Sequence, residues 1–80
     1  MSDVLQMIPM DMLQKNESGR IVEIVGPHDW KHRLQELGLR DGAIVRVVKP
    51  GTPSIIAIDG HRFSFRSDPN TVVLVELLPA

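Results

Sequence analysis

The dipeptide Asp59-Gly60 is the feature that most constrains how this chain can fold. It separates two expected strands, the apolar residues 55–58 and the residues 61–65 that carry Phe63 and Phe65. Asp-Gly in this setting strongly indicates a two-residue β-hairpin, because a type I′ turn needs positive φ at both central residues. Such a short turn also determines the strand register. The pairs expected on the core-facing side are Ile58 with His61, Ile56 with Phe63 and Ser54 with Phe65, while Ala57 and Arg62 pair on the other side.

Turn signals recur at short intervals along the rest of the chain, which is typical of a small β-rich barrel or sandwich. Segments rich in β-branched residues predict strands at residues 20–25, 43–49 and 71–77. Together with the hairpin they make five expected strands.

Residues 29–37 change to a helical period. We expect Asp29 to cap the N-terminus of this helix and Gly38 to end it in a left-handed conformation. Leu39 would then pack against Leu34, the apolar contact that accompanies a Schellman ending. The face expected to turn inward carries Trp30, Leu34 and Leu37.

The N-terminal region predicts a short helical turn over residues 9–14, with Pro9 in its first turn. Asn16 can then reverse the chain, since Asn tolerates positive φ. Residues 1–7 are a candidate for disorder. The sequence as a whole predicts a single mainly β domain over residues 1–80, a partly open five-stranded barrel with one inserted α-helix and a short helical turn in front.

Composition excludes several classes of function. The chain has no cysteine, which rules out disulfides, thiolate metal sites and thiol nucleophiles and fits a reducing cytoplasm. A formal net charge of −1 argues against a nucleic-acid partner, because phosphate binding needs clustered Lys and Arg. Apolar runs are far shorter than the about 20 residues that a membrane-spanning helix needs. The N-terminus lacks the cationic start of a secretory signal, so export is not expected.

The histidines raise the possibility of a metal site. His28 and His32 are four residues apart, a spacing that can place two imidazoles on one side of a helix. His28, however, lies just before the expected N-cap, so the pair need not share a face, and no third ligand is evident. Solvated histidines are the favoured interpretation, with His28 and His32 as weak metal candidates and no cofactor expected.

No catalytic motif is present: the chain lacks a phosphate-binding G-x-x-x-x-G-K loop, a G-x-S-x-G elbow and an H-E-x-x-H helix. We therefore expect a protein that is not an enzyme. Trp30 is the only tryptophan. It can be part of the core or an anchor in a partner interface, where Trp is enriched.

The order of motifs resembles the FeoA domain of ferrous iron transport protein A. The resemblance covers residues 8–76, and its most specific segment is R-L-x-E-L-G-L-x-x-G at residues 33–42. Further matching segments are residues 10–13, 18–24, 45–48, 59–66 and 73–76, together with Pro53. Lys15-Asn16 stands where the family usually has Pro-Gly.

The resemblance implies an SH3-like barrel and a cytoplasmic accessory protein of ferrous iron uptake. Its implied partner is FeoB, a membrane transporter with a cytosolic GTP-binding domain. The face expected to bind this partner is the helix and its exit, with Trp30, Arg33 and Leu37 as contacts, although Leu at this spacing is more often core. The open strand edges also leave a homodimer possible.

An alternative function is a stand-alone metal-responsive module, similar to the SH3-like C-terminal domain of iron-dependent repressors. This hypothesis requires metal binding by His28, His32 or His61. A nucleic-acid-binding barrel is disfavoured by the charge and by the small number of aromatic rings.

Overall fold

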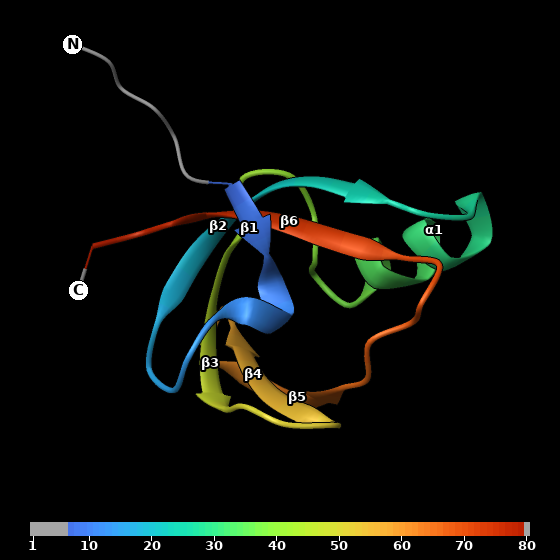
Figure 1. Cartoon of the computed structure of the whole chain (residues 1–80). Helices are drawn as coiled ribbons and strands as arrows, with labels where there is room; N and C mark the ends of the chain where they lie inside the picture. The colour runs from blue at the N-terminus through green and yellow to red at the C-terminus, as the bar shows by residue number, and fades with distance from the viewer. Residues whose placement is uncertain (1–6, 80) are drawn as a thin grey trace, which may run out of the picture.

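This computed structural model describes residues 7–79, which form a strongly curved antiparallel sheet with one α-helix at one end (Figure 1). The elements in chain order are strand β1 (Met7–Pro9), 3₁₀ helix η1 (Met10–Met12), β2 (Ser18–Val25), helix α1 (His28–Glu36), β3 (Ile44–Lys49), β4 (Ser54–Ile58), β5 (His61–Phe65) and β6 (Val72–Leu77).

The sheet has six strands in the order β1-β6-β2-β3-β4-β5, and every neighbouring pair is antiparallel. Strands β1 and β5 are the two edges, and they do not pair with each other, so the barrel is partly open. This confirms the expected mainly β, SH3-like architecture with one inserted helix. The expected number of five strands is wrong.

The additional strand is β1, which pairs with β6 through Ile8 opposite Val75. The short helical turn expected over residues 9–14 forms, but it is shorter than expected: Pro9 ends β1, and η1 is a single 3₁₀ turn closed by the Leu13 N–H donating to the Met10 carbonyl at 3.1 Å. A turn this short has no room for repeated i to i+4 bonds, and the residues just before it pair with β6 as strand β1. Met7 therefore belongs to a strand, and the disorder expected for residues 1–6 lies outside the described residues.

The hairpin between β4 and β5 forms as its turn residues predict. Asp59 and Gly60 both have positive φ, 52° and 80°, as a type I′ turn requires. The register matches the predicted one at every pair named above. Local turn chemistry was therefore sufficient to determine this part of the sheet.

The core lies between the two halves of the curled sheet, with β1, β6 and β2 on one side and β3, β4 and β5 on the other (Figure 1). Inward residues alternate along the strands, for example Val45 and Val47 on β3 and Val73 and Val75 on β6. Phe63 and Phe65 are partly buried against the same cluster. The buried apolar side chains are those of Met10, Leu13, Ile21, Ile24, Leu34, Leu39, Val45, Val47, Ile56, Ile58, Val73 and Val75.

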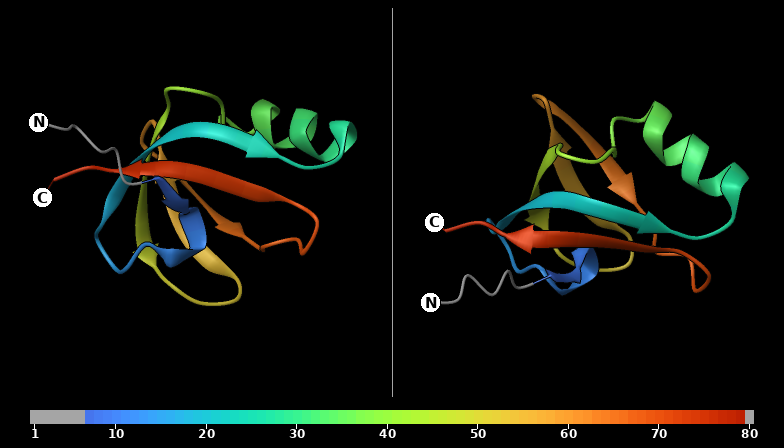
Figure 2. Two further views of the ribbon diagram at one scale, coloured as in Figure 1. Left: turned by 45° about the horizontal axis from the view of Figure 1, so that its top comes forward. Right: turned by 90° about the horizontal axis from the view of Figure 1, so that it is seen from above.

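Helix α1 projects beyond the end of β2, away from the closed part of the barrel (Figure 2). Asp29 is not its N-cap, contrary to expectation. The N-cap lies two residues earlier, at Pro27, and the Lys31 N–H donates to the Pro27 carbonyl at 2.9 Å. Asp29 lies in the first turn, where a carboxylate is favoured by the helix dipole. His28 is consequently the first helical residue.

The C-terminus of α1 is the predicted Schellman ending. Gly38 has a φ of 106°, its N–H donates to the Gln35 carbonyl, and the Leu39 N–H donates to the Leu34 carbonyl, both at 3.0 Å. Leu34 and Leu39 are both buried in the core. This reversal attaches the helix to the barrel.

Replacing Gly38 with Ala should lower the free energy of unfolding by about 1 kcal/mol, because an L-residue is strained at this φ. An added Cβ would meet only Ile58 Cγ2 at 3.5 Å, an ordinary contact, so the loss reflects the backbone. Urea unfolding measures the change. Gly38→Asn is the matched variant and should lose less, because Asn tolerates positive φ; equal losses for Ala and Asn would contradict the explanation.

Replacing Gly19 with Ala tests a different constraint, the close approach of β2 to β6. A Cβ at Gly19 would lie 2.7 Å from Val75 Cγ2, a buried side chain. Overpacking of this kind costs about 1–3 kcal/mol. In the same unfolding assay, the neighbouring control Ser18→Ala should change stability by less than about 0.5 kcal/mol. A neutral Gly19→Ala variant would show that the strands can separate freely.

Candidate functional site

All of the predicted partner-binding residues lie along one flank of α1 and at its exit. Trp30, Arg33 and Leu37 follow each other at spacings of three and four, so they stack along the same side of the helix. The barrel holds this flank in place through Leu34, which is 2% exposed. Their positions are therefore set by the helix and its attachment rather than by a mobile loop.

Trp30 packs against the core and is only partly exposed. Its indole Nε1 is buried and has no hydrogen-bond partner within residues 7–79. The Arg33 guanidinium lies over the indole ring, with Cζ 5.7 Å from the ring centroid, within the range of a cation–π contact. Arg33 thus places a positive charge beside the one tryptophan of the chain.

Leu37 is 53% exposed, whereas Leu34 and Leu39 on either side of it are buried. The expectation that Leu37 shares the inward face of the helix with Leu34 is wrong. The reason is the helix ending: Leu37 is the C-cap residue, and the reversal at Gly38 sends Leu39, not Leu37, into the core. An apolar side chain therefore remains on the surface beside Arg33.

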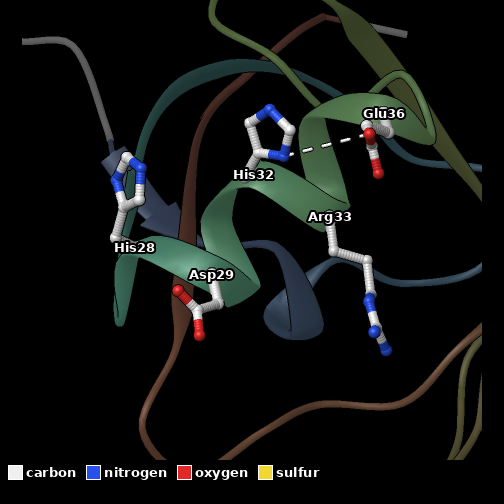
Figure 3. Close-up of a pocket in the computed structure, with 5 residues that line it drawn as sticks. All are labelled: His28, Asp29, His32, Arg33 and Glu36. Atoms are coloured by element: carbon white, nitrogen blue, oxygen red, sulfur yellow. Dashed lines mark ion pairs between the residues drawn. The ribbon is translucent and has the colours of Figure 1, made fainter.

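The histidines lie on another side of α1. His28, Asp29, His32, Arg33 and Glu36 line a shallow surface hollow (Figure 3). The rings of His28 and His32 stack with centroids 6.5 Å apart and an interplanar angle of 27°. The expectation that this pair need not share a face is thus overturned, because the helix starts at His28. His61 is elsewhere, at the start of β5.

The described residues contain no group of three or more His, Cys, Asp or Glu side chains arranged to hold a metal ion. His28 and His32 form a pair only. Salt bridges are similarly few in this part of the chain: Arg20 Nη1 lies 3.2 Å from Glu76 Oε1 on the outer face of the sheet, and His32 Nδ1 lies 3.9 Å from Glu36 Oε2.

Sequence reasoning missed two further surfaces. One is a cavity of about 170 Å³ at the open seam of the barrel, bridged by Ser67 Oγ, which lies 3.5 Å from Asp11 Oδ2. Residues from the two sheet edges meet there only in the folded chain, so no local pattern could indicate it. The lining residues are Pro9, Met10, Asp11, Phe65, Ser67, Thr71, Val72 and Val73.

The other missed surface is the outer face of the sheet, where several apolar side chains are exposed. A register shift between β2 and β6 turns Val22 and Glu23 outward together. Val25 and Val72 pair across the same two strands and are both exposed. A strand pattern alone does not reveal such a bulge.

A family model described as the FeoA domain matches residues 8–77. The structure is similar to the crystal structure of an iron uptake regulatory protein, FeoA, with a TM-score of 0.83 and 28% identity over 91% of this chain and 100% of that one. It is also similar to the NMR structure of a FeoA-like protein from Clostridium acetobutylicum, with a TM-score of 0.76 and 18% identity over 94% and 91% of the two chains.

No curated protein matches the chain. Within residues 7–79, no helix is both long and apolar enough to span a membrane. The family match extends over nearly all of the described barrel, including α1 and the Schellman turn. The chain belongs to the FeoA domain family.

Proposed function

We propose that this chain is a cytoplasmic, non-catalytic accessory protein of ferrous iron uptake. Its partner is a FeoB-type membrane transporter, which it binds through the transporter's cytosolic GTP-binding domain. The family match supports the role in iron uptake, and a similar protein of solved structure is described as an iron uptake regulatory protein.

The exposure of Leu37 is the observation that most supports this side of α1 as the partner-binding surface. An apolar side chain that is 53% exposed gains stabilisation when a partner covers it, at roughly 25 cal/mol for each Å² removed from water. Arg33 adjoins it and adds a charge that a carboxylate of the partner can pair with. Leu37 and Arg33 together offer an apolar contact and a polar one side by side.

The surface is also rigid, which favours binding. Burial of Leu34 and Leu39 on either side of the Gly38 reversal holds α1 on the barrel. The Arg33 guanidinium is already placed over the Trp30 ring. Little conformational entropy therefore needs to be lost when a partner docks, and preorganisation of this kind increases affinity.

Two substitutions test this surface. Leu37→Ser and Arg33→Gln should each weaken binding to the transporter's cytosolic domain about tenfold, which corresponds to about 1.4 kcal/mol. Isothermal titration calorimetry in the GTP-bound and GDP-bound states measures the affinity. Met12→Ser is the matched control: Met12 is 66% exposed but lies on η1, and its removal should leave the affinity within about twofold.

If Met12→Ser weakened binding to the cytosolic domain as much as Leu37→Ser does, the loss would not be specific to α1, and this would contradict α1 as the contact surface. NMR shifts confined to the outer sheet face or to the seam cavity would show the same. Titration against the intact transporter in a lipid nanodisc completes the test, and absence of binding there in both nucleotide states would overturn the proposed partner.

A further inference from the structure

The side of α1 that carries the histidines is a second surface with chemistry of its own. Figure 3 shows the side chains of His28, His32 and Glu36 on one side of the helix, with Asp29 and Arg33 turned toward the other. His28 and His32 are exposed, and the side chain of His32 is 65% exposed. Packing therefore leaves both rings accessible to a ligand.

The two imidazoles are close to the geometry of a chelate. Imidazole nitrogen binds zinc at about 2.0–2.1 Å with near-tetrahedral angles, which places the centroids of two rings on one ion about 5 Å apart. The rings of His28 and His32 are 6.5 Å apart. Both side chains are exposed, so rotation about their side-chain bonds can change this distance.

Glu36 is placed to orient the ring of His32 through a hydrogen bond, as carboxylates commonly do for metal-binding histidines. Its Oε2 lies 3.9 Å from His32 Nδ1, one turn further along the helix. A carboxylate that accepts a hydrogen bond from Nδ1–H orients the ring and leaves Nε2 free for a metal ion. A slight movement of the exposed Glu36 side chain would bring it to that distance.

The positively charged side chain of Arg33 is turned away from the two histidines, toward Trp30. The Arg33 guanidinium lines the same hollow but lies over the Trp30 ring, 5.7 Å from its centroid. Glu36 leaves a carboxylate on the same side of the helix as the two histidines, while the Asp29 carboxylate is turned away from them. Glu36 therefore provides a negative charge beside the proposed site.

We infer that His28 and His32 form a two-histidine site for one borderline divalent cation of the Zn²⁺ class, completed by water and supported by Glu36. Neutral imidazole suits zinc, copper, iron and nickel, and divalent ions bind nitrogen sites in the order Fe²⁺ below Ni²⁺ below Cu²⁺, with Zn²⁺ below Cu²⁺. Ni²⁺ and Cu²⁺ should therefore bind the site more tightly than Fe²⁺. This inference does not rest on the proposed partner, because it uses different residues of the helix.

Titration of the full chain with zinc chloride, followed by the imidazole NMR signals, tests the site directly. The signals of His28 and His32 should move together, at one ion per chain, while those of His61 stay in place. His28→Gln and His32→Gln should each reduce the zinc affinity at least tenfold. His61→Gln is the matched control, since His61 is also exposed but lies on β5, and it should leave the affinity within twofold.

Thermal unfolding provides a second readout. An ion that bridges the first two turns of α1 stabilises the folded chain by mass action. Zinc should therefore raise the unfolding temperature of the wild type and of His61→Gln more than that of His28→Gln. Glu36→Gln should lower the zinc affinity less than loss of either histidine does, because Glu36 orients the ring of His32 and is not itself a metal ligand.

Several outcomes would overturn the site. They are equal movement of the His61 signals, unchanged affinity in either histidine variant, a stoichiometry of two chains per ion, or tighter binding of Fe²⁺ than of Ni²⁺ under anaerobic conditions. The metal-free variants should unfold at the wild-type temperature, since His28 and His32 are exposed, and this excludes misfolding as the cause of a lost affinity.

Discussion

The chain reversal at Gly38 holds α1 on the barrel, and both proposed binding surfaces depend on it. Gly38 adopts a φ of 106° that brings Leu39 into the core next to the helix that Leu34 anchors. Because Leu39 takes the buried position, Leu37 remains outside. One backbone conformation therefore secures the helix and also determines which leucine a partner can reach.

The helix presents different chemistry on different sides. Trp30, Arg33 and Leu37 form a flank with apolar and cationic character, while His28, His32 and Glu36 form a side rich in nitrogen and oxygen donors. Arg33 borders both regions, because it lines the histidine hollow and lies over the indole ring. A partner on one side and a cation on the other can therefore occupy the same short helix.

Much of the fold was predictable because its determinants are local. The turn at Asp59-Gly60 established the β4–β5 register, and Gly38 marked the end of α1. Strand β1 was not predictable, since three residues ending in Pro carry no period and pair only because β6 offers an edge. The N-cap of α1 lies two residues before the expected one, because Pro27 rather than the polar Asp29 occupies the cap position.

The sequence by itself determined the mainly β class, the single helix, the hairpin register and the family, because turn residues, strand composition and motif order act over short distances along the chain. The tertiary structure decided the sixth strand, the bulge that exposes Val22, the exposure of Leu37 and the seam between β1 and β5. These features arise from competition among residues far apart in sequence for the same interior volume and the same strand edges, which no local pattern records.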